Sequence, residues 1–394
     1  MKHLVICGGG FAGVRLARKL KNKKDITISL INDSPYFRYY PAMYRAAAGF
    51  KMASARIPLE WMLIDHPRLS LYQDKVSGVD PVHKVITTAS GGQLSYDYAV
   101  FALGSETTYF NIEGIPEHSY GMKSPDEVTE LRQHLHNSIT SNREADENYV
   151  IAGAGPAGVE LAGGLGKYIK KIAKKHKAKN HKVRVYLVEA GPRILPMLSE
   201  RNAKAVQRRL EKRGVKILTG TAVTRETASQ LRTSHGTIKS HTVIWTAGTM
   251  NNRFFAAHPQ QFELNKRGRV IVNNHLQTKD GLYVIGDNAA TPHAGLALTA
   301  VEHANFIAKD IKARMHNKPR PKKYEKEPIV VVPIDDSWAA LQYKQLALHG
   351  WVIAQVRRAA DFIGYSDVLG HIKALSIWSN GEKTENNCST CDKS

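Results

Sequence analysis

Two glycine-rich loops are the residues of this sequence whose types and spacing most directly predict chemistry. One runs from Gly8 to Gly13 and the other from Gly153 to Gly158. Each follows a short apolar run typical of a buried strand and opens a stretch with helical spacing of apolar residues. In such a loop the first glycine permits a tight turn, the second lets the backbone approach a pyrophosphate, and the third allows the helix to pack closely on the strand. Two loops therefore predict two dinucleotide sites, one for a flavin and one for a nicotinamide nucleotide. The predicted contacts are Gly8, Gly10, Phe11, Ala12 and Gly13 in the first site and Gly153, Gly155 and Gly158 in the second.

The strand that follows each loop should end at a residue that binds the adenosine ribose. In the second site this residue is Glu189, whose carboxylate would bond a 2′-hydroxyl and repel a 2′-phosphate. NADH is therefore favoured over NADPH, although nearby Arg193 keeps NADPH open. In the first site the residue is Asn32, followed by Asp33. An amide can still bond a hydroxyl, so the prediction of a ribose contact stands there as well.

Two acidic residues are candidates for chemistry beside these loops. Asp287 follows Gly286 at the end of an apolar strand, where its carboxylate can accept a hydrogen bond from a sugar or ribityl hydroxyl. Glu160 lies two residues after the last glycine of the second loop. It either complements the helix dipole or faces the nicotinamide, and position alone does not decide between the two. The aromatic segment 36–45 either lines a flavin or forms an aromatic corner of the core.

The C-terminal stretch contains two further features. Residues 359–378 place Phe362, Tyr365, Val368, Leu369, Ile372 and Leu375 on one face of a predicted helix. That helix would lie either in a membrane interface or against the core or a dimer partner. Cys388 and Cys391 form a CxxC pair, which is a redox dithiol candidate or an inert tail pair. No second Cys or His pair with metal-like spacing accompanies it, so no metal site is predicted.

The composition is that of a globular protein with an unusual charge. The 394 residues carry 56 Lys and Arg against 35 Asp and Glu, a net charge of +21. Such an excess favours an anionic partner, either a membrane surface or nucleic acid. No signal peptide or membrane-spanning run is expected, and three cysteines favour a reducing compartment.

Taken together, these motifs resemble the type II NADH:quinone oxidoreductases, also called alternative NADH dehydrogenases. The resemblance rests on both loops, Phe101–Glu106, Val188–Pro196, Trp245–Gly248 and Val284–Asp287, and covers roughly residues 1–350. It implies an α/β fold with two Rossmann-like domains, the NADH domain being inserted into the FAD domain. The implied divisions are 1–114 and 251–329 for FAD, 115–250 for NADH, and 330–394 for a C-terminal region that associates with a membrane.

The resemblance also implies the chemistry and its residues. FAD would be bound non-covalently, NADH would give it a hydride, and two electrons would pass to a quinone without proton pumping. Asp287 matches the ribityl contact, and Glu160 matches the acid near flavin and nicotinamide. The further cofactor candidates are Ala102, Gly104, Gly248, Leu296 and Ala297. A peripheral place on the cytoplasmic face of the cell membrane and a homodimer are the accompanying expectations.

One stretch departs from the family pattern. Relatives carry an Ala-Gln motif and then a Gln pair on the helix after the Gly-Asp strand, and these residues are associated with quinone. Here Leu298 replaces the first Gln, and Glu302 and His303 replace the pair. We therefore expect an altered quinone site in which Glu302 and His303 deliver protons to the reduced quinone.

Two alternatives to quinone reduction follow from the residues. The tail could bring Cys388 and Cys391 to the flavin, so that electrons leave through a dithiol. The basic surface could instead hold nucleic acid in a flavin-dependent binding protein, although nucleic acid is not among the expected partners.

Overall fold

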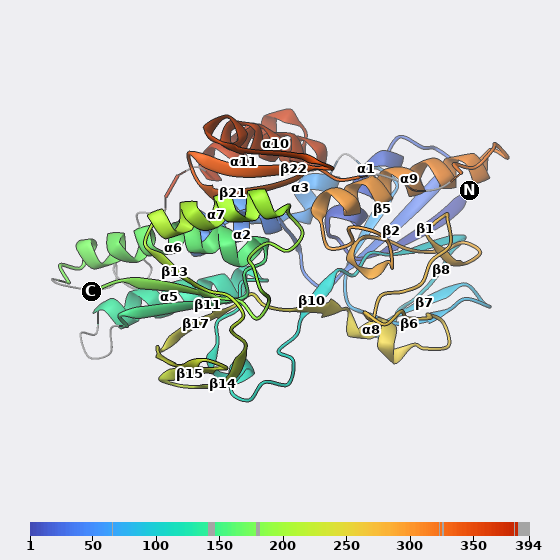
Figure 1. The fold of residues 1–394 in the computed structure, drawn as a ribbon. Coiled ribbons are helices and arrows are strands. Elements are labelled where there is room, and N and C mark those ends of the chain that lie inside the picture. The colour runs from blue at the N-terminus through green and yellow to red at the C-terminus, as the bar shows by residue number, and fades with distance from the viewer. Residues whose placement is uncertain are drawn as a thin grey trace.

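The computed structural model describes all residues except 65, 141–145, 179–181, 323, 325, 326, 382 and 385–394. Cys388 and Cys391 therefore lie outside the described residues. Within the described part, one mainly parallel and one parallel sheet form two lobes, and a C-terminal layer lies over both (Figure 1). The predicted α/β class is confirmed.

The first glycine loop belongs to a six-stranded sheet. Its strands in spatial order are β19 (Gln277–Lys279), β20 (Leu282–Val284), β9 (Tyr98–Phe101), β1 (Lys2–Cys7), β2 (Ile26–Asn32) and β5 (Leu69–Gln73). All neighbours pair in parallel except β19 with β20. Apolar side chains fill the strands because both faces are covered. Helices α1 (Phe11–Leu20) and α9 (Ala297–Met315) pack against each other on one face, and Phe101, Phe254, Phe255 and Phe262 cluster on the other.

Smaller elements complete this lobe. They are β3 (Tyr36–Arg38), β4 (Arg56–Pro58), β6 (Val76–Asp80), β7 (Val85–Thr88), β8 (Gln93–Ser95), α2 (Tyr40–Ala47), α3 (Leu59–Leu63) and α8 (Arg253–Ala257), with short 3-10 turns η1 (Met52–Ser54) and η2 (Gly286–Asn288).

The second glycine loop belongs to a four-stranded parallel sheet of β13 (Val215–Leu218), β12 (Arg184–Val188), β11 (Asn148–Ala152) and β17 (Thr242–Trp245). Its lobe also contains α4 (Ile115–His118), α5 (Pro125–Thr140), α6 (Pro156–Lys175), α7 (Glu200–Lys212), β14 (Val223–Thr227), β15 (Gln230–Thr233) and β16 (Gly236–Lys239). Strands β10 (Ser105–Thr107) and β18 (Thr249–Asn251) pair antiparallel where the chain passes between the lobes (Figure 1).

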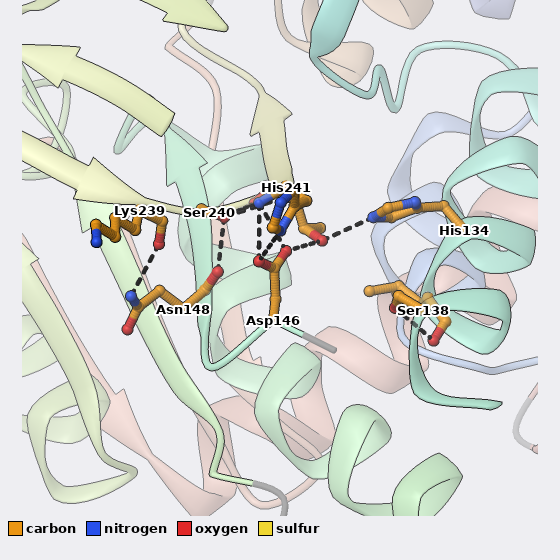
Figure 2. A network of polar contacts seen from close by, with 9 residues as sticks. His134, Ser138, Asp146, Asn148, Lys239, Ser240 and His241 are labelled. Atoms are coloured by element: carbon orange, nitrogen blue, oxygen red, sulfur yellow. Dashed lines mark hydrogen bonds and ion pairs between the residues drawn. The ribbon is translucent and has the colours of Figure 1, made fainter. Parts of the chain in front are cut away.

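A buried carboxylate ties together the amino ends of β11 and β17. Asp146 accepts hydrogen bonds from the backbone and ring nitrogens of His241 and from the Thr242 hydroxyl (Figure 2). The Thr242 oxygen is in turn 2.8 Å from Nε2 of His134 on α5. This network lies at the opposite end of the strands from the glycine loop, whereas ligands of such sheets bind at the carboxyl ends. We therefore assign it a structural role.

The C-terminal layer consists of β21 (Val330–Asp335), β22 (Trp338–Tyr343) and β23 (Leu346–Gly350), followed by α10 (Trp351–Leu369) and α11 (His371–Gly381). The prediction of one continuous helix over 359–378 is wrong, because Gly370 adopts φ +82° and separates α10 from α11. Tyr365, Val368 and Leu369 are buried in the core, whereas Ile372 and Leu375 of α11 are exposed. The predicted apolar face is therefore divided between core packing and surface. No described helix is long and apolar enough to span a bilayer.

Candidate active site

A cavity of about 1080 Å³ lies where the two lobes and the C-terminal layer meet. Both glycine loops contribute to its wall, through Gly8 to Ala12 on one side and Pro156 and Ala157 on the other. Helix α10 adds Arg357 and Asp361. Part of each loop of phosphate-binding type thus lies on the wall of the same cavity, which would bring nucleotides bound at the two loops close to each other.

The first loop has the form that a pyrophosphate requires. Gly8 adopts φ +111°, and a Cβ on Gly13 would lie 1.9 Å from the Gly8 carbonyl oxygen, so neither position accepts a side chain. A Cβ on Gly10 would meet nothing within 4 Å. Helix α1 has no side chain capping its amino end. Its first N–H groups therefore remain available to an anion at the open position of Gly10.

The second loop repeats this arrangement. Gly153 adopts φ +107°, a Cβ on Gly158 would lie 2.0 Å from the Gly153 carbonyl oxygen, and Gly155 faces open space. Helix α6 also lacks a side-chain cap and begins with Pro156, whose missing N–H costs no hydrogen bond at this position. The residues present thus fit a dinucleotide at both loops.

The two predicted ribose residues occupy equivalent positions. The Asn32 side-chain oxygen accepts a hydrogen bond from the Gly9 N–H at 2.7 Å, and Glu189 accepts one from the Ala154 N–H at 2.8 Å. The second Glu189 oxygen accepts from the Gly191 N–H at 2.7 Å. These bonds hold each side chain at the tip of its loop, where an adenosine ribose would lie.

Arg193 and Asp33, the neighbours of these residues, are engaged elsewhere. The Arg193 guanidinium donates to the backbone carbonyls of Leu195, Pro196 and Leu198. The Arg193 guanidinium therefore stabilises its own loop and is not available to bind a 2′-phosphate. This geometry favours NADH over NADPH. Asp33 lies 3.8 Å from the Arg38 guanidinium and also lines the cavity.

Asp287 lines the cavity together with a pair of polar residues that the sequence did not single out. Ser105 donates to the Asp287 carboxylate at 2.9 Å, and the Lys123 ammonium donates to the Ser105 hydroxyl at 2.8 Å. Burial lowers the pKa of Lys123, while Asp287 and Glu127 oppose that shift. Lys123 belongs to no motif, because it reaches the site only through the pairing of the lobes.

Glu160 faces the cavity, so its side chain does more than complement the helix dipole. Its surroundings are Tyr44 from α2 and the ion pair of Arg357 with Asp361 from α10. No hydrogen-bond partner for its carboxyl is found among the described residues. Burial raises the pKa of Glu160 to about 8; Asp361 adds to this shift and Arg357 opposes it. The carboxyl therefore exchanges a proton near neutral pH, which is the property of a proton carrier.

The aromatic segment 36–45 contributes both to the core and to the cavity wall. Phe37 and Tyr39 are buried against Phe11, and Tyr39 also lines the cavity together with Tyr36, Tyr40 and Tyr44. The Tyr39 hydroxyl donates to Asp361 at 3.1 Å and its ring stacks on Tyr365 of α10. This segment thus fixes α10 against the lobe of the six-stranded sheet.

Helix α9 contributes to the cavity wall only through residues at its start. Leu296, Ala297 and Leu298 line the cavity, but His303 is fully buried and its Nδ1 accepts a hydrogen bond from the Gly286 N–H. Burial lowers the pKa of His303 to about 4, so the ring is neutral and supports the end of β20. Glu302 lies beside Tyr324 rather than on the cavity wall. Neither residue lines the cavity, so the structure gives no support to the prediction that these two residues deliver protons to a quinone.

Four of the remaining predicted contacts lie at the cavity, whereas Gly13, Gly153, Gly155, Gly158 and Glu189 are not among the residues that line it. Ala102, Gly104, Gly248 and Gly286 line it, and Gly286 and Gly104 adopt φ +67° and +70°. Asn288, which no motif indicated, bonds both backbone groups of Gly104 and so joins the ends of β9 and β20. Among the described residues, no group of three or more His, Cys, Asp or Glu could hold a metal ion.

Comparison with known proteins gives consistent matches. The family model described as pyridine nucleotide-disulphide oxidoreductase matches residues 2–304. The type II NADH:quinone oxidoreductase Ndh of Mycobacterium tuberculosis is 30% identical over 338 residues, which cover 79% of this chain and 73% of that protein. The NADH dehydrogenase-like protein YutJ of Bacillus subtilis is 29% identical over 326 residues, which cover 82% of this chain and 86% of that protein.

Solved structures match in fold. NDH2 from Plasmodium falciparum in complex with NADH superposes with a TM-score of 0.84 at 15% identity and covers 96% of this chain and 97% of its own. The sulfide:quinone oxidoreductase of Aquifex aeolicus superposes with a TM-score of 0.80 at 20% identity. The match covers 99% of this chain and 98% of that protein.

Proposed function

Because the chain belongs to the pyridine nucleotide-disulphide oxidoreductase family and, within it, to the type II NADH:quinone oxidoreductases, we propose that it transfers two electrons from NADH through FAD to a quinone. The observation that carries this proposal is the single cavity shared by both glycine loops and α10. FAD would bind at the first loop, with Asp287 at its ribityl chain, and NADH at the second loop, with Glu189 at its ribose.

FAD held at the first loop would supply the redox chemistry between NADH and the quinone. The chain supplies orientation, exclusion of water and a proton. The loops orient the two nucleotides toward each other, and Glu160 lies between the second loop and α10, where a proton is needed when a quinone is reduced.

The acceptor end of the cavity has the chemistry that a quinone requires. Its wall between α9, β21 and α10 is largely apolar, with Leu298, Val332 and Ile363 among its residues. Arg357, Asp361 and Asp367 are polar residues of α10 on this wall, and among these three Arg357 can donate a hydrogen bond to a quinone carbonyl. We propose that Arg357 takes over the orienting role of the family's Gln residues, which this chain lacks.

We expect the purified flavoprotein to be bleached by NADH without oxygen and then to be reoxidised rapidly by a soluble quinone. A chain ending at Asn380, which lacks the CxxC pair, should be reoxidised equally fast. Following flavin absorbance in a stopped-flow instrument tests both statements. Reoxidation by a disulfide but not by quinone, and only in the full chain, would contradict the proposal and favour the thiol alternative.

Exposed apolar residues near the acceptor end support membrane attachment. Trp61 and Ile64 at α3, Ile363 on α10, and Ile372 and Leu375 on α11 are all exposed, with Ile372 89% and Ile64 70% accessible. Helices α3 and α11 adjoin, since the Lys373 ammonium donates to the Trp61 carbonyl. We name these five residues the apolar rim, and we propose that it enters the membrane interface on the cytoplasmic face, so that a quinone can pass from the bilayer to the cavity.

Replacing Ile363 and Ile372 with Glu should release the protein from liposomes, because two charges would have to enter the apolar interface. The expected loss is about tenfold or more in the membrane-bound fraction, measured by flotation. Val82→Glu, at an apolar residue that is 82% exposed elsewhere on the surface, is the matched control and should float like the wild type. Equal flotation of the rim variant and the control would contradict the proposed attachment.

A further inference from the structure

A second, smaller cavity lies behind the active site. It has a volume of about 120 Å³ and lies between α2, α6, β21 and α10. Glu160 and Arg357 line both this small cavity and the large one, so they form part of the wall between the two. The two nucleotides and the quinone of the proposed function occupy only the large cavity, which leaves the small cavity without a role.

Positive charge dominates the walls of the small cavity. Four acidic residues line it, and three of them are paired or neutral. Asp335 pairs with Arg213 at 2.7 Å, and Asp361 pairs with Arg357. Burial raises the pKa of Glu160 to about 8, so this carboxyl is mostly uncharged at pH 7. The cationic residues on the walls are Arg45, Lys167, Lys171, Arg213, Arg357 and Arg358.

Two lysines of α6 lie at the mouth of the small cavity. Lys167 and Lys171 are four residues apart, share one face of the helix and are exposed. The Lys171 ammonium donates to the Thr384 hydroxyl at 3.0 Å, whereas Lys167 makes no hydrogen bond or ion pair with any residue that the structure describes. Like charges one helical turn apart repel each other, and an anion between them removes that repulsion. The fourth acidic residue, Asp336, is exposed to solvent, which screens its charge.

The other walls of the small cavity add guanidinium groups. Arg358 comes from α10 and Arg45 from α2, where the Arg45 guanidinium lies 4.5 Å from the centroid of the Phe50 ring. Ammonium and guanidinium groups together suit a phosphate, because its several oxygens can accept charge-assisted hydrogen bonds from different sides. A carboxylate has only two oxygens and would engage fewer of these cations.

The volume of the small cavity fits one phosphate group. It provides room for several water molecules, which is enough for a tetrahedral anion, and it is far smaller than the large cavity. The space exists because small residues face it from two helices. A Cβ on Gly164 of α6 would come within 3.1 Å of the Ala48 Cβ, and a Cβ on Gly49 would meet the Tyr168 ring at 2.3 Å.

The mouth of the small cavity adjoins the end of the helix that carries part of the apolar rim. Helix α11 bears Ile372 and Leu375 of the rim and ends at Gly381, about 9 Å beyond Leu375 along the helix axis. The chain then reaches the mouth at Thr384, which pairs with Phe50. Attachment through the rim would therefore hold the mouth within reach of lipid headgroups.

We propose that the small cavity is a binding site for a phosphate group, held by Lys167 and Lys171 of α6 and by Arg358 of α10. The phosphate belongs either to a lipid headgroup or to a free phosphate ion, since the two share this chemistry. The site rests on the charges and the volume of the small cavity, so it does not depend on quinone as the electron acceptor.

Titration of inorganic phosphate into the flavin-loaded enzyme tests the site. NAD⁺ is present at saturation so that both glycine loops are occupied, and chloride keeps the ionic strength constant. We expect saturable binding by calorimetry and a higher melting temperature, because a ligand bound only by the folded state stabilises it. Replacing both Lys167 and Lys171 with Gln should weaken phosphate binding about tenfold or more, since two contacts to a charged group are lost.

Two further variants show where the phosphate binds. Lys170→Gln combined with Lys174→Gln removes the same charge from exposed positions of α6 that do not line the small cavity, and it should bind phosphate like the wild type. Ala48→Leu keeps every charge but fills the small cavity, and it should abolish phosphate binding. Ala48 does not line the large cavity, so flavin content and NADH oxidation should be unchanged.

Flotation with vesicles separates the two sources of phosphate. Phosphatidylcholine vesicles with added phosphatidic acid present a phosphate monoester, and pure phosphatidylcholine vesicles are the reference. Weaker flotation of the Lys167→Gln/Lys171→Gln variant than of the Lys170→Gln/Lys174→Gln variant, only with phosphatidic acid, would identify a lipid headgroup. Equal flotation of the two variants, with the difference in binding of inorganic phosphate retained, would identify a free phosphate ion.

Two results would overturn the phosphate site. One is the absence of saturable phosphate binding by the wild type, and the other is equal phosphate affinity in the two double variants. Quinone reduction by NADH is measured in parallel. Phosphate binding without any quinone reduction would remove the proposed function and leave the phosphate site in place.

Discussion

Replacing Glu160 with Gln is expected to lower quinone reduction about a hundredfold, the usual loss when a positioned general acid is removed. Glutamine keeps the size and polarity of the side chain but carries no exchangeable acid proton. Reduction of the flavin by NADH in a single turnover should change little, because that step transfers a hydride and needs no proton from the protein. Stopped-flow measurement of the two half-reactions separates these effects.

A matched substitution on α9 provides the control for Glu160→Gln. Glu302→Gln removes a carboxyl that lies outside the cavity wall and should leave both half-reactions unchanged. Nearly full quinone turnover in Glu160→Gln would mean that Glu160 only complements the dipole of α6. A large loss in Glu302→Gln would restore Glu302 as the proton donor.

The pH dependence of turnover follows from the same residue. Burial raises the pKa of Glu160 from 4.5 to about 8, so the carboxyl is protonated in the folded enzyme over most of that interval. The protonated form is the donor, and the rate of quinone reduction should therefore fall as the pH rises through about 8. Glu160→Gln should lack this decrease. The raised pKa also means that the folded state binds more protons than the unfolded chain between these values, so this group's contribution to stability declines as the pH rises from 4.5 to 8.

Placing a Glu at the open glycine of each loop is expected to abolish one nucleotide site at a time. Gly10 and Gly155 have φ of −83° and −70°, which any residue adopts, and their Cβ positions are unobstructed. The fold should therefore persist. The new carboxylate would occupy the place of a pyrophosphate and repel it. Loss of two charged hydrogen bonds costs about 3 kcal/mol, which is about a hundredfold in affinity.

The two variants should differ in which nucleotide they lose. Gly10→Glu should purify with little flavin, as measured by its visible absorbance. Gly155→Glu should keep its flavin and show about a hundredfold higher KM for NADH. Loss of flavin in Gly155→Glu with retention in Gly10→Glu would reverse the assignment of the two loops. An unchanged melting temperature without added nucleotide is the control for folding.

Features that depend on local backbone geometry could be predicted from the amino-acid sequence. Each loop is recognisable because its first and third glycines are forced by contacts within the loop or with the adjoining strand end, such as that between Gly13 and the Gly8 carbonyl. Glu189 was predictable for the same reason, since it ends the strand next to its loop and bonds the loop backbone. Such constraints act over short spacings and leave a pattern in the sequence.

Packing between distant segments of the chain sets which polar residues line the cavity. Arg357, Asp361 and Lys123 belong to no motif, because packing of α10 and pairing of the lobes bring them to the cavity. His303 is a residue type that can carry protons, and it lies on a helix that begins at the cavity. Its ring nevertheless points into the core and accepts a hydrogen bond from the Gly286 N–H. Helical periodicity continues through Gly370 in the sequence. In the structure the helix ends there, and the apolar face is divided between core and surface. The direction in which a side chain points depends on what packs against its element, and those partners lie far away along the chain.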